Sequence, residues 1–85
     1  MTKIWAKIVI NHSVRKSVVH DCGEKIHEFN FYNNVREICE QLKIPTPVIL
    51  ETYIRTFLDF NILKFKQRDF LEEINFDQFV LESGE

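Results

Sequence analysis

The alternation of apolar and polar residues predicts a strand at the start of the chain. From Lys3 to Ile10 the alternation has a period of two, which is typical of a strand with one buried face. The predicted inward residues are Ile4, Ala6, Ile8 and Ile10, and the outward residues are Trp5, Lys7 and Val9. A polar turn at Asn11-His12-Ser13 precedes a second segment with β-branched residues, from Val14 to His20. The first twenty residues therefore predict an antiparallel hairpin.

The turn Asp21-Cys22-Gly23 follows this hairpin, and a third short strand from Lys25 to Phe29 stays open as a possibility. Two helices are predicted next. The apolar residues of the first share one helical face, with Asn30 as the N-cap; they are Phe31, Val35, Ile38, Cys39 and Leu42. Pro45 ends this helix because proline disfavours helical geometry at the residue before it.

The second predicted helix starts at Thr46 and Pro47 and extends to about Phe60. It is apolar around most of its circumference, so we expect a central element that is packed on several sides. Asn61 suits a left-handed stop, and Ile62 to Lys66 alternates as an edge strand would. Residues 69–74 predict a short helical segment, which is followed by the apolar residues Phe76, Phe79 and Val80.

Together these elements predict one α+β domain over residues 1–85. Its architecture would be an N-terminal antiparallel hairpin of two or three strands, packed on two main helices, with a short C-terminal helical segment. Aromatic residues make up 13% of the chain, which supplies the core that a small domain needs.

Apolar runs are too short for a membrane span or a signal-peptide core, so we expect a cytoplasmic protein that does not bind membranes. In that compartment Cys22 and Cys39 would stay reduced, and we assign both to packing.

Charge is segregated along the chain, although the formal net charge is only −2. Residues 1–20 contain four basic residues and no acidic residue, whereas residues 69–85 contain six acidic residues and no basic residue. We interpret the two ends as lying side by side, in the monomer or across a dimer. The alternative is an external anionic partner for the hairpin.

Residues 36–49 resemble a helix-turn-helix register, with Cys39 as the small residue inside the first helix. The pattern departs from DNA-binding examples because its turn carries Lys43 in place of glycine. Its outer face presents Leu50, Glu51 and Ile54 rather than groups that read bases. Binding of nucleic acid by a helix-turn-helix variant is therefore the alternative hypothesis and not the leading one.

Chemistry-bearing residues do not form a familiar motif. His20, Cys22 and His27 lie close together in sequence without the paired spacing of a structural zinc site. The two glycines, Gly23 and Gly84, do not form a phosphate-binding loop. We expect no enzymatic activity, no metal and no cofactor.

The leading hypothesis is a non-enzymatic protein-interaction or regulatory module that self-associates, as a homodimer for instance. Trp5 points away from the predicted core, and Val9 and Val19 would extend an apolar patch around it if no other element covers that face. The candidate interaction surface is Trp5, Lys7, Arg15 and Lys16.

The segments Ile44-Pro45-Thr46-Pro47-Val48-Ile49-Leu50 and residues 69–82 are similar to a small conserved bacterial protein family, mostly from clostridial-type genomes, with no assigned activity. This resemblance implies a bacterial cytoplasmic origin, and it implies no catalytic or binding residues.

Overall fold

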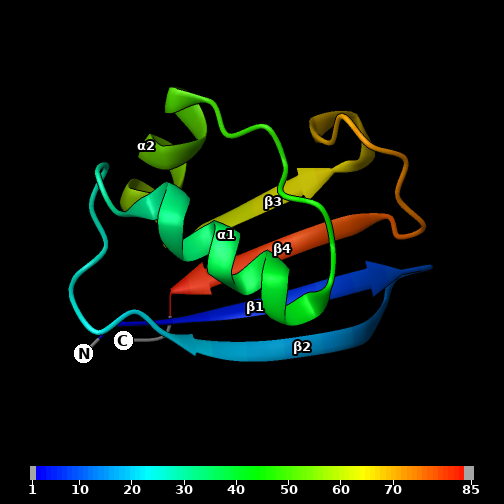
Figure 1. Ribbon diagram of the computed structural model, residues 1–85, viewed down its shortest axis with the longest axis horizontal. Helices are drawn as coiled ribbons and strands as arrows, with labels where there is room; N and C mark the ends of the chain where they lie inside the picture. The colour runs from blue at the N-terminus through cyan, green and yellow to red at the C-terminus, as the bar shows by residue number, and fades with distance from the viewer. Residues whose placement is uncertain (1, 84–85) are drawn as a thin grey trace.

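Two helices lie on one side of a four-stranded antiparallel sheet in the computed structural model, which describes residues 2–83 (Figure 1). The elements in chain order are β1 (Lys3–Ile10), β2 (Ser13–Asp21), α1 (Phe31–Leu42), α2 (Glu51–Phe60), β3 (Ile62–Lys66), the 3-10 turn η1 (Gln67–Asp69) and β4 (Gln78–Ser83). The strand order is β2-β1-β4-β3. The first and the last strand are therefore the two central strands.

The predicted architecture is wrong in its second half. The helices do not follow a finished hairpin sheet; they are inserted between β2 and β3, and β3 and β4 then complete the sheet. The possible third strand at residues 25–29 is a loop. The predicted helix at residues 69–74 is absent, because Asp69 is the last residue of η1 and residues 70–74 are irregular. Aromatic packing holds this irregular segment, because the rings of Phe70 and Phe76 meet edge to face at a centroid distance of 5.4 Å.

The hairpin over the first twenty residues is present. Asn11 and His12 both have positive φ, 51° and 67°, as the two central residues of a type I′ hairpin turn do. Lys16 pairs with Ile8 and Val14 pairs with Val9, so Arg15 is an extra residue in β2. This β-bulge adds local twist to the edge strand.

Helix α1 begins after Asn30 as predicted, but Asn30 does not cap it through its side chain. The Asn30 Oδ1 accepts a hydrogen bond from the backbone N–H of His27 at 2.9 Å and so closes the loop before the helix. The helix ends at Lys43, which has a left-handed conformation with φ 59°.

The predicted start of α2 at Thr46 and Pro47 is wrong, because this helix begins at Glu51. The backbone N–H of Val48 donates to the carbonyl oxygen of Asp69 at 2.7 Å, which ties this segment to η1 in place of a helical partner. The prediction that α2 is central is also wrong, since Phe57 is its one fully buried residue.

The core fills the space between the sheet and the helices. Phe31 of α1 meets Phe57 of α2 at a ring centroid distance of 5.2 Å, and Phe65 of β3 stacks on Phe79 of β4 at 5.8 Å. Helix α1 supplies most of the helical core residues, namely Phe31, Val35, Ile38, Cys39 and Leu42. One face of the sheet is thus covered by helices.

Within residues 2–83, neither helix has the length and apolar character needed to cross a lipid bilayer.

Candidate interaction surface

The face of the sheet that points away from the helices carries the strongest candidate site. Side chains alternate along each strand, and paired residues of neighbouring strands lie on the same face. The strand register therefore defines this surface, which we term the open face: Lys3, Trp5, Lys7 and Val9 of β1; Val14, Ser17, Val19 and Asp21 of β2; Ile62, Lys64 and Lys66 of β3; and Gln78, Val80 and Glu82 of β4. Both helices lie on the other side of the sheet (Figure 1).

Trp5 lies near the centre of the open face. Its direct neighbours across the strands are Val19 on β2 and Glu82 on β4. Trp5 is 49% exposed and Val19 is 58% exposed, so no described segment covers them. Ile62 continues the same row on the far edge strand. An indole and two aliphatic side chains thus share one accessible row across the sheet.

Lys7 places a positive charge beside the Trp5 ring and pairs with Glu82. Its Nζ donates to Glu82 Oε1 at 2.9 Å and lies 5.0 Å from the centroid of the Trp5 ring. The ammonium group therefore bridges a carboxylate and the face of an indole, in an ion pair combined with a cation–π contact. This arrangement holds the Trp5 side chain against the sheet and neutralises the charge next to it.

The Lys7–Glu82 pair also shows where the basic start of the chain lies relative to its acidic end. Strands β1 and β4 are direct neighbours, and Asp77 Oδ2 accepts a hydrogen bond from the backbone N–H of Asn11 at 2.7 Å. The interpretation that the basic start and the acidic end lie side by side is confirmed within the monomer.

The structure brings together two of the four predicted surface residues, Trp5 and Lys7. Arg15 lies at the bulge of edge strand β2, and Lys16 pairs with Ile8 on the helix side of the sheet. Both are exposed, and no described carboxylate lies within ion-pair distance of either. They form a separate basic edge.

Sequence reasoning missed Lys64, Val80 and Glu82 as members of this surface. The alternation of Ile62 to Lys66 was a usable signal for the strand, but its position in the sheet requires the strand order. Strand β4 shows no alternation in the sequence. Val80 lies on the open face but is apolar, like its neighbours Phe79 and Leu81, which point toward the helices.

The His20 cluster at the other side of the sheet has a structural arrangement. Gln41 Nε2 donates to His20 Nδ1 at 3.0 Å, so the ring proton lies on Nε2 and is donated to Asn34 Oδ1 at 3.0 Å. Glu37 Oε2 lies 3.4 Å from the same Nε2. These bonds fasten β2 to α1. Over residues 2–83, no three His, Cys, Asp or Glu side chains form a group suited to a metal ion.

The surroundings of the two thiols favour their protonated form. Burial raises the pKa of Cys22 to about 11, with smaller contributions from Asp21 and Glu37. Burial also raises the pKa of Cys39 to about 12, although a hydrogen bond with Thr46 acts in the opposite direction. Nucleophilic and metal-binding cysteines need the thiolate, which these environments disfavour.

The helix pair lacks the short turn of a helix-turn-helix motif. Between the end of α1 at Leu42 and the start of α2 at Glu51 lies an irregular connection whose Val48 is bound to Asp69. The predicted register over residues 36–49 is therefore wrong.

Comparison with known proteins identifies no relative: no family model matches the chain, and no curated protein or solved structure matches it either.

Proposed function

We propose that this protein is a protein-interaction module that self-associates through the open face of its sheet. The observation that carries the proposal is the half-exposed Trp5, between Val19 and Glu82, near the centre of a sheet face that neither helix covers. Tryptophan is enriched at the centres of protein interfaces. Burying such apolar area is favourable by about 25 cal/mol per Å².

The mixture of charges on the open face favours a second copy of the chain as the partner. Lys3, Lys64 and Lys66 lie on the same surface as Asp21, while Lys7 and Glu82 already pair. In a twofold dimer each copy presents the same surface, so a face with both signs can be complementary to itself. The helices leave this face free for such packing (Figure 1).

The size of the face limits it to a small, weak dimer interface. Four strands spaced about 4.8 Å apart make a surface roughly 19 Å wide, and six residues of strand give a length of about 20 Å. Its projected area of about 380 Å² is roughly half of the 800 Å² that a standard specific interface buries on each partner, so it fits a weak dimer. We expect a reversible dimer rather than an obligate one.

Nucleic acid is the alternative partner, and two observations disfavour it. Glu82 lies beside Trp5 and neutralises Lys7, so a phosphate group near the indole would meet a carboxylate. The helix pair also lacks the short turn that a recognition helix needs. Binding to DNA would depend steeply on salt, whereas an apolar interface changes little with salt.

The test uses Trp5 as its own reporter, because it is the single tryptophan of the chain. Sedimentation velocity over a micromolar concentration series, at low and moderate salt, should show a salt-tolerant dimer. The tryptophan emission should shift to shorter wavelength as the dimer forms, since the indole leaves water.

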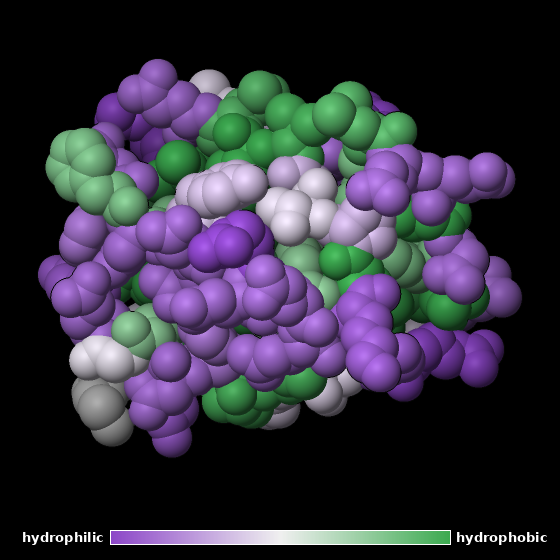
Figure 2. Space-filling view, viewed as in Figure 1, coloured by the Kyte–Doolittle hydropathy of each residue, from purple (hydrophilic) through white to green (hydrophobic). Residues whose placement is uncertain are grey.

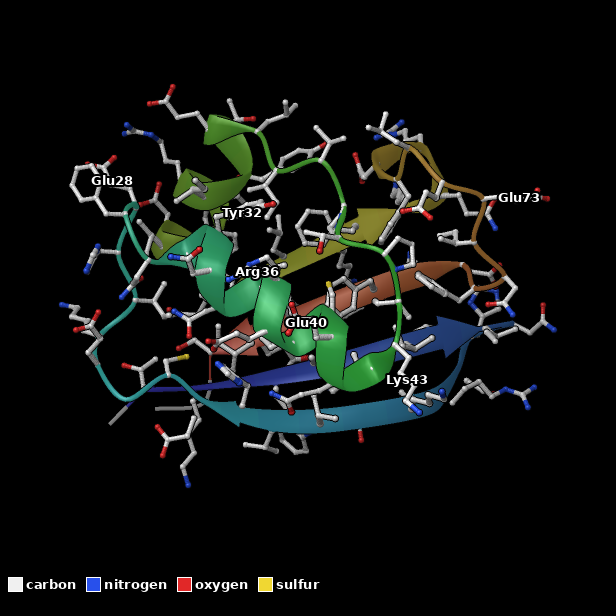
Figure 3. All side chains as sticks on the ribbon, in the orientation of Figure 1. Glu28, Tyr32, Arg36, Glu40, Lys43 and Glu73 are labelled. Carbon is white, nitrogen blue, oxygen red and sulfur yellow. The ribbon has the colours of Figure 1, made fainter. Side chains whose placement is uncertain are left out.

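The variant Trp5→Ala should remain a monomer at concentrations where the wild type is dimeric. Tyr32→Ala is the matched control, because Tyr32 is equally exposed, at 50% against 49%, but lies on α1 on the other side of the sheet (Figure 3). A wild type that stays monomeric, or a Trp5→Ala variant that dimerises normally, contradicts the proposal. A monomer that shifts with a mixed-sequence duplex at low salt would support the alternative.

A further inference from the structure

We propose that a groove on the outer side of α2 binds a cationic, amphipathic peptide segment of another protein. The groove is separate from the open face, because it lies on the helix side of the molecule. It has a volume of about 380 Å³. Its walls come from the loop before α1, with Glu28 and Phe29, and from α2, with Glu51, Ile54, Leu58 and Asp59.

The groove exists because α2 packs on one side only. Phe57 is buried in the core and Ile54 is partly buried against it, whereas Leu58, one helical turn from Ile54, lies on the outer side. Leu58 is 41% exposed, and Phe29 on the opposite wall is 83% exposed. The groove is therefore lined by the partly buried Ile54 and by two apolar side chains that no described segment covers, Leu58 and Phe29.

The rim of the groove carries mostly negative charge, which favours a cationic ligand. Glu28, Glu51 and Asp59 supply three carboxylates against the single guanidinium of Arg55, and none of the four takes part in an ion pair within the described chain. An occupant that buries apolar side chains here also brings its own cations to these carboxylates. Nucleic acids and anionic lipid surfaces would be repelled.

The spacing of the carboxylates indicates a peptide segment rather than a single small cation. Glu51 and Asp59 are eight residues apart on α2, which corresponds to about 12 Å along a helix axis. A peptide helix with apolar residues on one side and Lys or Arg at its margins matches both the floor and the rim.

The groove is lined by α2 and the loop before α1, and not by the outer face of α1. Figure 2 shows a hydrophilic surface over α1, where Arg36 and Glu40 lie (Figure 3). Glu28 lies at the α2 end of the molecule, and Glu73 lies at the opposite end, in the connection between η1 and β4 (Figure 3). Glu73 is therefore a suitable control for charge effects that are not specific to the groove.

The experiment measures fluorescence anisotropy of a labelled amphipathic peptide of Leu and Lys, and of its analogue with Glu in place of Lys. The Leu-Lys peptide should bind, and the Leu-Glu peptide should not. Leu58→Ser and Glu51→Lys should each weaken binding by about tenfold. Their matched controls, Leu71→Ser and Glu73→Lys, remove an exposed leucine and an exposed carboxylate elsewhere and should leave binding unchanged.

All four positions are exposed on the surface, and circular dichroism verifies that each variant is folded. Failure of the Leu-Lys peptide to bind overturns the proposal, as does equal weakening by Glu73→Lys. If Leu58→Ser abolishes self-association, the occupant is a second copy of the chain and the peptide proposal is wrong. Trp5→Ala should bind the peptide normally, so the groove and the open face are tested independently.

Discussion

Lys43 is the residue whose backbone conformation is least suited to its side chain. It ends α1 with φ 59° and ψ 44°, a left-handed conformation in which a Cβ atom is costly. Asn61 ends α2 with almost the same φ, 61°, but asparagine adopts this conformation more readily. The two helix ends therefore form a natural comparison.

Lys43→Gly should raise the free energy of unfolding by about 0.5–1 kcal/mol, because glycine has no Cβ and this gain exceeds the entropy it adds to the unfolded chain. Asn61→Gly should produce a smaller change. Urea unfolding followed by circular dichroism measures both. Destabilisation by Lys43→Gly would mean that the lysine side chain contributes more at this helix end than its strain costs.

Cys22, Cys39 and Tyr53 have raised pKa values, and each should lower the stability of the fold at alkaline pH. The folded pKa values of Cys22 and Cys39 are about 11 and about 12, against an ordinary value of 9.0. The pKa of Tyr53 is also raised, first because its hydroxyl donates to Asp69 Oδ1 at 2.5 Å. Each proton is held more tightly by the folded protein than by the unfolded chain.

Stability should therefore fall as the pH rises above about 9. Below the unfolded pKa of 9.0 both thiols are protonated in either state and their contribution is complete; it is lost as the pH rises through about 11 and about 12. Thermal unfolding between neutral pH and pH 11 checks this, and Cys39→Ala should flatten the alkaline part of the curve. An unchanged alkaline slope in Cys39→Ala would contradict the assignment to the buried thiol.

At the scale of the elements, local pattern predicted the N-terminal hairpin and α1. The hairpin was predictable because alternation and turn residues agree over residues 3–20. Helix α1 was predictable because its apolar residues form one stripe, which is its buried face. Strand β4 was missed because its sequence does not alternate between apolar and polar residues. It lies between β1 and β3, so Val80 is buried although it belongs to the open face.

The start of α2 was wrong for a different reason. Thr46 and Pro47 are good local signals for a helix start, but Pro47 is buried and the N–H of Val48 bonds to Asp69. That partner is 21 residues further along the chain, so no local rule contains it. Tertiary contacts overrode local propensity at this junction.

Phe57 is the one buried residue of α2, although Tyr53 and Ile54 also pack against the core, and it leads to a prediction about the helix. Phe57→Ala should destabilise the fold by about 3–5 kcal/mol, because it removes the ring that packs on Phe31 and leaves a cavity. Phe60→Ala should have little effect, since Phe60 is exposed on the same helix. Denaturant unfolding distinguishes them, and similar losses from both variants would mean that α2 is packed on more than one side.

At the scale of the whole molecule, half of the candidate surface was predictable and half was not. Trp5 and Lys7 follow from the alternation of one strand, without knowledge of its neighbours. Glu82 and Lys64 join them only because β4 and β3 follow β1 in the sheet. Their placement depends on strand order, which pairs residues almost the full length of the chain apart.

Arg15 and Lys16 allow the two hypotheses about partners to be separated. They lie on the basic edge of β2 and not on the open face, so reversing both to Glu should leave the dimer intact. The same change should abolish any binding to a polyanion, because it removes two cations and adds two anions. Sedimentation with and without duplex measures both effects. Loss of the dimer in this double variant would place the interface at the edge strand.

The central position of β1 determines when the sheet can be completed during synthesis. Its partner on one side, β2, follows directly, but its partner on the other side is β4, which is synthesised after the other three strands of the sheet. Until Gln78–Ser83 has emerged, one edge of β1 has no strand to pair with. A nascent chain stalled before this point presents an open strand edge that recruits other chains. The native sheet therefore closes only after translation of its final strand, and truncated products of this chain should aggregate rather than fold.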